Sequence, residues 1–194
     1  MRSSKDMHLV RGKGLGQDDD AELLRRAGQG DEAAVRRLFR SHAPRLHRHV
    51  SRVLGASDPD VDDVVQQIFL AALDGADRFD GRSSVSTWLF GIATRRALDA
   101  ARARWRRQRF RRLGEQIGFT GVATRPDRMF DATAEAEEAL GKMTPDQRTV
   151  FLLHDVEGYT FAEISEVTGL GISTLHGRLQ ASRRQIESLA GDEP

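Results

Sequence analysis

Arginine side chains crowd into one stretch of this sequence, and their chemistry is the binding of phosphates and base edges. From Arg82 to Arg112 the chain carries ten arginines against a single acid, Asp99. A guanidinium has a fixed charge and a planar fork of donors that suits phosphate groups and guanine. This segment therefore predicts a surface for a polyanion, even though the net charge of the whole chain is only +1.

The compensating acids are concentrated elsewhere. Between Asp131 and Glu163 there are eight acidic residues against only Lys142 and Arg148. Opposite charges are thus sorted into separate blocks along the chain rather than mixed. The arginine-rich segment favours binding to nucleic acid, and the acidic segment does not.

A second nucleic-acid feature lies near the C-terminus, in TFAEISEVTGLGISTLHGRLQASRRQI. The pattern predicts a short helix, a turn containing glycine and a longer helix, which is the helix-turn-helix arrangement. Leu175 and Leu179 would face inward, and the opposite face of the longer helix would enter the major groove. The side chains left to contact DNA are Ser173, Thr174, His176, Arg178, Gln180, Arg183 and Arg184. A plain helical hairpin with a solvated polar face is the alternative for this fragment taken alone.

The elements that must position these residues are helices. Apolar residues recur at three- and four-residue steps over 20–112 and again over 132–190, and almost no stretch alternates as a strand would. Residues 113–131 contain three glycines and a proline without a sustained period. We therefore predict an all-α protein of two helical modules joined by a flexible linker, after a flexible leader over residues 1–19.

Several helix boundaries can be predicted from capping residues. Asp31 can cap a helix that restarts at Pro44, and Thr144 followed by Pro145 can begin a helix reaching Glu157. The short helix of the helix-turn-helix is expected over residues 161–168, and the final helix from about Ile172. We expect Thr160 and Glu163 to form a capping box at the start of the short helix, with Gly169 after its end.

Composition excludes several other kinds of site. The chain has no cysteine, so disulfides and thiolate metal sites are excluded. His42, His47 and His49 do not share one helical face, and we predict neither a metal site, a catalytic residue nor a cofactor. No apolar run approaches the roughly 20 residues that cross a bilayer, and the N-terminal residues lack the apolar core of a secretory signal. We expect a soluble, cytoplasmic protein without membrane insertion.

Three carboxylates, Asp60, Asp62 and Asp63, cluster where a helix is expected to begin. Acids are favoured at that position by the helix dipole. The same cluster leaves open a nucleic-acid enzyme that uses a bound metal, which a magnesium-dependent cleavage assay would reveal.

Four ordered blocks give the sequence a family resemblance. They are GDEAAVRRLFRSHAPRLHRHV, DVDDVVQQIFLAAL, FDGRSSVSTWLFGIATRRALDAARAR and MTPDQRTVFLLHDVEGYTFAEISEVTGLGISTLHGRLQASRRQI. Together they resemble the sigma-70 family of bacterial transcription initiation factors, in its short extracytoplasmic-function class. The resemblance implies that residues 20–112 form a sigma2-like bundle and residues 132–190 a sigma4-like helix-turn-helix domain.

The family further implies the partners of each module. The sigma2-like module would bind the clamp helices of the polymerase beta prime subunit and the minus-ten element, including its melted single strand. The sigma4-like module would bind duplex DNA at the minus-thirty-five element and the flap of the beta subunit. An anti-sigma factor is the usual regulator of this class.

Matching positions carry the expected contacts onto this chain. The residues implied for polymerase binding are Asp62, Asp63, Gln66 and Gln67. Those implied for the minus-ten element are Phe79, Asp80, Gly81, Arg82, Ser83 and Ser84 in a loop, followed by Arg95, Arg96 and Arg102. The minus-thirty-five contacts are the outward residues of the final helix given above.

The chain departs from the family pattern at a few of these positions. An acid is common where Gln67 stands, and asparagine is common where Arg95 stands. In the final helix His176 and Ala181 replace a lysine and an arginine, which should weaken duplex binding by this module alone. A helix-turn-helix regulator that is not a polymerase subunit is the alternative function, but it would leave DVDDVVQQIFL without a purpose.

Overall fold

The computed structural model describes residues 17–55, 58–116 and 138–190, and within them every regular element is a helix. The elements are α1 (Gln17–Gly28), α2 (Glu32–Leu54), α3 (Val61–Asp74), the 3-10 turn η1 (Ala76–Arg78), α4 (Val85–Gln116), α6 (Pro145–Phe151), the π-helical turn η2 (Leu152–Val156), α7 (Phe161–Thr168) and α8 (Ile172–Ala190). Residues 138–142 are also helical. The prediction of an all-α protein is confirmed.

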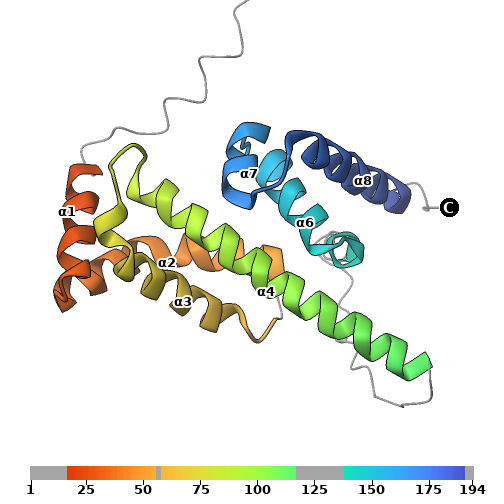
Figure 1. Cartoon of the computed structure of the whole chain (residues 1–194), viewed down its shortest axis with the longest axis horizontal. Coiled ribbons are helices and arrows are strands. Elements are labelled where there is room, and N and C mark those ends of the chain that lie inside the picture. The colour runs from red at the N-terminus through yellow and green to blue at the C-terminus, as the bar shows by residue number, and fades with distance from the viewer. Residues whose placement is uncertain (1–16, 56–57, 117–137, 191–194) are drawn as a thin grey trace, which may run out of the picture.

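Helices α1, α2 and α3 pack against the first half of α4, which is the longest element and runs beyond them (Figure 1). Their core is made of side chains from each helix, among them Leu24, Leu38, Ile68 and Leu89, all fully buried. Burying apolar surface of this kind is the main term that stabilises such a bundle. The result is a rigid platform from which α4 projects.

The C-terminal helices pack on the same long helix. Both α6 and α7 contact α4, while α6 and α8 contact one another (Figure 1). One apolar cluster runs without a break from Leu89 in α4 to Val150, Ile164 and Leu175 in the C-terminal helices. The rings of Phe90 and Tyr159 stack nearly parallel across the junction, with centroids 5.4 Å apart. The two groups of helices therefore share one core in this structure.

Helix α2 is continuous, so the prediction that a helix restarts at Pro44 was wrong. Proline removes one backbone hydrogen bond from a helix interior. Here the buried residues Leu38, His42, Leu46 and Val50 follow one another at four-residue steps on both sides of the proline. Because they form one buried face, their packing offsets the lost bond and keeps the helix whole.

Other boundaries differ by a few residues from those predicted. Helix α1 begins at Gln17 rather than after a leader ending at 19, and α4 extends to Gln116 rather than 112. The helix begun by Thr144 changes to the π-helical turn η2 after Phe151 instead of continuing as one helix to Glu157. The remaining parts of the leader and linker, 1–16 and 117–131, lie outside the described residues. No helix in the described part of the chain has the length and apolar character to span a bilayer.

His49 is a buried polar group that joins α2 to α4. Its Nε2 lies 3.0 Å from Oγ1 of Thr94, and that hydroxyl donates to the carbonyl of Phe90 at 3.0 Å. The ring nitrogen therefore donates, which assigns a neutral imidazole with its proton on Nε2. Burial lowers the pKa of His49 to about 3, and the charges of Arg45 and Arg52 contribute to the shift.

This histidine should make the fold sensitive to acid. Between pH 6.5, the ordinary pKa, and about pH 3, the His49 ring is protonated in the unfolded chain but neutral in the folded one. The free energy of unfolding therefore falls as pH falls through that window. We expect a loss of about 2 kcal/mol at pH 5 relative to pH 7. In chemical unfolding experiments, the His49→Leu variant should not show this pH-dependent loss of stability. His47→Leu, at a half-exposed ring on the same helix, should retain it. Equal pH dependence in His49→Leu and the unaltered protein would assign the effect to another group.

Candidate nucleic-acid and polymerase interface

One face of α3 is apolar and buried, while the other is exposed and carries polar side chains together with Leu70. Val61, Val64, Val65 and Ile68 pack into the core. The residues on the opposite side, all exposed as the sequence predicted, are Asp62, Asp63, Gln66 and Gln67. Both acids stand in the first turn, where the helix dipole favours them. The chain thus displays a small acidic and amide-rich patch without disturbing its core.

The loop before α4 holds the predicted residues 79–84. Phe79 is partly buried and meets the ring of Trp88 edge-on, with centroids 5.5 Å apart. Asp80 turns back to accept the backbone N–H of Arg82 at 3.1 Å, and Gly81 has a φ of 72°, which favours glycine. The tip of the loop is exposed, whereas Phe79 and Trp88 are partly buried and pack against the core.

Ser83 and Ser84 complete this loop. Ser83 is exposed, and Oγ of Ser84 accepts the N–H of Thr87 at 3.1 Å, so it caps the start of α4. The cap fixes where α4 begins and hence the direction in which its arginines point. Ser84 therefore has a structural role in addition to its predicted place in the loop.

The predicted arginines of α4 differ in their surroundings. Arg96 is exposed. Arg95 reaches the C-terminal end of α7, where Nε donates to the carbonyl of Val167 at 3.0 Å and Nη2 to that of Glu166 at 3.4 Å. A cation is favoured at this negative end of a helix dipole.

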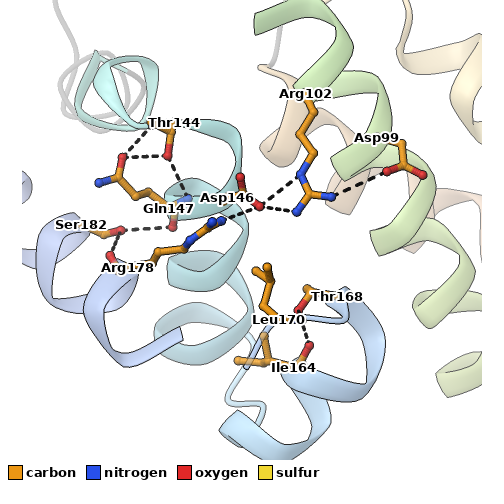
Figure 2. Close-up of polar contacts among 10 residues, drawn as sticks. All are labelled: Asp99, Arg102, Thr144, Asp146, Gln147, Ile164, Thr168, Leu170, Arg178 and Ser182. Atoms are coloured by element: carbon orange, nitrogen blue, oxygen red, sulfur yellow. Dashed lines mark hydrogen bonds and ion pairs between the residues drawn. The ribbon is translucent and has the colours of Figure 1, made fainter. Parts of the chain in front are cut away.

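Arg102 and Arg178 come from different modules and share one carboxylate. Arg102 Nε lies 3.1 Å from Oδ1 of Asp146, and Nη1 of Arg178 lies 2.6 Å from the same oxygen. Figure 2 shows the two guanidinium groups converging on Asp146 from α4 and α8. All three side chains are mostly shielded from solvent, and that of Asp146 is 19% exposed.

The helix-turn-helix has the local geometry that the sequence predicted. Thr160 and Glu163 form a capping box at the start of α7, with Oε2 of Glu163 accepting the N–H of Thr160 at 2.8 Å. Gly169 ends the helix in the left-handed conformation, with φ at 72°. Oγ of Ser182 donates to the carbonyl of Gln147 at 3.1 Å, which ties α8 to α6. These contacts fix the angle at which α8 is presented.

The outer face of α8 carries the residues predicted for duplex DNA. Those that are exposed are Ser173, Thr174, His176, Gln180, Arg183 and Arg184. The ring of His176 lies over Phe161, with centroids 3.9 Å apart. Arg183 makes a two-pronged contact with Asp155 at 2.7 and 2.8 Å, which lowers the pKa of that carboxyl. Arg178 is half-buried, unlike the others.

Two acids that pair with arginines distant in the sequence were missed by sequence reasoning. Asp146 receives Arg102 and Arg178, and Asp58, whose side chain is almost completely buried, pairs with Arg104 of α4. The opposite charges of the segments over 82–112 and 131–163 could have suggested that they meet. The particular partners could not be deduced from that pattern. In the described part of the chain no three histidine or acidic side chains converge as metal ligands would.

Comparison with known proteins agrees with this geometry. The family model for sigma-70 region 2 matches residues 38–107, and that for sigma-70 region 4 matches residues 133–186. The ECF RNA polymerase sigma factor SigM of Mycobacterium tuberculosis is 31% identical over 178 residues, which is 92% of this chain and 88% of SigM. The RNA polymerase sigma factor CnrH of Cupriavidus metallidurans is 31% identical over 182 residues, covering 89% of this chain and 95% of CnrH.

Solved structures give the same result for the fold. CnrH in complex with the cytosolic domain of CnrY has a TM-score of 0.57 at 27% identity, covering 90% of this chain and 99% of that one. The sigma factor RpoE of Bartonella quintana, in complex with the anti-sigma factor NepR, also has a TM-score of 0.57, over 82% of this chain and 98% of that one. At 21% identity, that second likeness concerns the fold alone.

A helical sigma2-like bundle followed by a sigma4-like helix-turn-helix defines a transcription initiation factor of the sigma-70 kind. The chain belongs to this family, in its extracytoplasmic-function class. It binds core RNA polymerase and directs promoter-specific initiation. The alternative of a regulator acting apart from polymerase is not favoured, because such a protein would not need the region 2 segment.

Proposed function

We propose that this sigma factor binds polymerase and the two promoter elements through three separate surfaces. The polar face of α3 binds the clamp helices of polymerase, the loop over 79–84 with α4 binds the minus-ten element, and α8 binds the minus-thirty-five element. The observation that supports this most is the sorting of side chains on α3, where the three valines and Ile68 are buried and the four polar residues are exposed. An exposed acidic patch fits a basic partner, and arginines fit DNA.

The proposed division follows residues 20–112 and 132–190, with the linker between them. Recognition of the minus-ten element uses binding energy to hold unstacked bases, which cost a few kcal/mol per step to expose. The exposed loop tip, next to the partly buried rings of Phe79 and Trp88, is where such a base would be held. Because both modules sit on one polymerase, each raises the effective concentration of the other at its element.

Regulation and location follow from the same proposal. CnrH and RpoE were each solved with a second protein, the cytosolic domain of CnrY and the anti-sigma factor NepR. We extend this to the present chain and propose that an anti-sigma factor binds it. We also place it in the bacterial cytoplasm, where core polymerase acts.

Transcription with purified components tests the proposed function. The protein added to core polymerase should give run-off transcripts from specific starts across genomic DNA, and by itself should bind duplex promoter weakly. The reason is that α8 has few unpaired cations and the strand-binding arginines need melted DNA. Tight and specific duplex binding by the free protein, unchanged by core, would contradict the proposal.

The acidic face of α3 should act in capturing polymerase rather than DNA. Replacing Asp62 and Asp63 by lysine should lower affinity for core by about tenfold or more, since like charges would then face a basic clamp. The fold should be little affected, apart from a helix-dipole cost of about 0.3 to 1 kcal/mol per charge. Core affinity and thermal unfolding are measured together.

A matched variant replaces Glu32 and Asp77 by lysine, changing the net charge equally at exposed first-turn positions outside α3. It should retain core affinity. If both double variants lose affinity alike, the effect is one of net charge. If the Asp62 and Asp63 variant is folded and binds core normally, these acids serve only the helix dipole.

Two arginines of α8 should differ in what they recognise. Arg178 lies within the first two turns after Ile172, where side chains reach base edges, and Arg183 lies further along, where phosphates are closer. Arg178→Ala should cost about 1 to 3 kcal/mol and relax the preference at one base pair. Arg183→Ala should weaken all sequences alike and reduce the salt slope by about 1.

Lysine variants sharpen the comparison, because lysine retains the charge but not the two-pronged fork. Arg178→Lys should therefore still relax the base preference, whereas Arg183→Lys should restore affinity. Holoenzyme binding to a library randomised in the minus-thirty-five element, at two salt concentrations, measures both. The assignment fails if Arg178→Ala leaves the preferred sequence unchanged or Arg183→Ala alters it.

A further inference from the structure

Gly177 is a glycine in the interior of a helix that has no evident use within the fold. It is the sixth residue of α8, is exposed, and has no positive φ that would call for glycine. A Cβ placed there would have no atom of the described residues within 4 Å, apart from its own turn of helix and its chain neighbours. Glycine in a helix interior lowers stability relative to alanine, because it loses more backbone entropy on folding. No contact in the described structure offsets that loss.

Other glycines of the chain have a reason within the fold. A Cβ at Gly28 would lie 2.6 Å from that of Ala76, so the missing side chain lets α1 approach η1 closely. Gly169 has a φ of 72°, the left-handed conformation that ends α7. Gly177 has neither a close neighbour nor an unusual φ. A role for its missing side chain is therefore to be sought in contact with a partner.

The face on which Gly177 lies is turned away from the core. Leu175 and Leu179, two residues before and after it, are buried. With 3.6 residues per turn, a position two residues away points to nearly the opposite side of the helix. Gly177 also lies within the first two turns of the second helix of the helix-turn-helix, the part that reaches base edges. It is thus central to the surface that α8 presents to duplex DNA.

The long side chains on either side of Gly177 are directed to other helices of the same module. The ring of His176 lies over Phe161 of α7, with centroids 3.9 Å apart. Nη1 of Arg178 lies 2.6 Å from Oδ1 of Asp146 in α6 (Figure 2). One side chain is therefore drawn toward α7 and the other toward α6. The surface between them is bare helix backbone.

Bare helix backbone is an apolar surface. In an α-helix the N–H of an interior residue is bonded to the carbonyl four residues earlier, so Gly177 offers a partner its Cα hydrogens and no free donor. In the major groove every base presents hydrogen-bonding groups, and thymine alone adds a C5-methyl group. A methyl group needs no polar partner. The missing Cβ leaves room for one, since a carbon–carbon bond spans about 1.5 Å.

We infer that Gly177 is a specificity-determining position for the minus-thirty-five element, where the backbone of α8 receives the methyl group of one thymine. The inference rests on the proposed assignment of α8 to this element. The missing side chain lets the helix lie closer to the groove there than any other residue type would allow. The base pair that faces Gly177 is recognised by its shape and not by a hydrogen bond.

The variant Gly177→Ala separates this role from a neutral one, because stability and DNA binding should change in opposite directions. Alanine should raise the thermal midpoint of the free protein by about 1 to 4 °C, as expected for a helix-interior glycine in a chain of this size. Its methyl group would occupy the space of the thymine methyl, so holoenzyme affinity for promoter should fall about fivefold or more. Gly177→Leu, also a better helix former than glycine, should bind more weakly still.

The matched control is Gly141→Ala. Gly141 is an exposed glycine in the helical residues 138–142, outside α8. A Cβ there would lie 4.0 Å from Nη2 of Arg148, which is ordinary van der Waals contact. The control holoenzyme should therefore bind promoter as tightly as the unaltered one.

Replacing thymine by uracil, which lacks only the methyl group, tests the same contact from the DNA side and does not depend on how a variant folds. In the minus-thirty-five sequence that the unaltered holoenzyme prefers, each thymine on either strand is replaced in turn by uracil. At one position the replacement should lower affinity for the unaltered holoenzyme about threefold or more. The same replacement should have no effect on the Gly177→Ala holoenzyme.

Two results would overturn the inference. One is a stabilised Gly177→Ala protein whose holoenzyme binds promoter as tightly as the unaltered one. The other is a set of uracil replacements in which no position distinguishes the unaltered holoenzyme from the Gly177→Ala holoenzyme. Either result leaves the proposed function standing if the unaltered holoenzyme still prefers a particular minus-thirty-five sequence. If it shows no such preference, the proposed function of α8 fails and the inference fails with it.

Discussion

The carboxylate of Asp146 is the point on which the arrangement of this molecule depends. It forms ion pairs with Arg102 from the N-terminal module and Arg178 from the C-terminal one, in a partly shielded site where charge pairing is stronger than at an open surface. Around it, a shared apolar core and the bond from Arg95 to the end of α7 bring the same two modules together. An acidic segment and a basic segment that are separate in the sequence are thereby in contact in the folded chain.

That contact links architecture to function. A sigma factor must recognise two promoter elements but should not occupy DNA without polymerase. Under the proposed assignment, one arginine for each promoter element lies at this contact, whereas the acidic face of α3 is exposed.

Much of this structure could be predicted from local sequence patterns. The capping boxes at Thr144 and Thr160 and the turn at Gly169 depend on residues a few positions apart, so their types were enough. The helix through Pro44 was missed because its continuity depends on packing against other helices, which outweighs a local breaker. The ion pairs of Asp58 and Asp146 were missed for a similar reason, because their partners are distant in the sequence. The exposed faces of α3 and α8 were predicted from periodicity, whereas the half-burial of Arg178 was not.

The distance between the modules tests this account most directly. Spin labels on cysteines that replace Arg107 in α4 and Glu187 in α8, both exposed and in a chain otherwise free of cysteine, would report it. The account predicts one short and narrow distance distribution for the free protein, because the two groups of helices share one core. A broad distribution centred on a long distance in the free protein would contradict it.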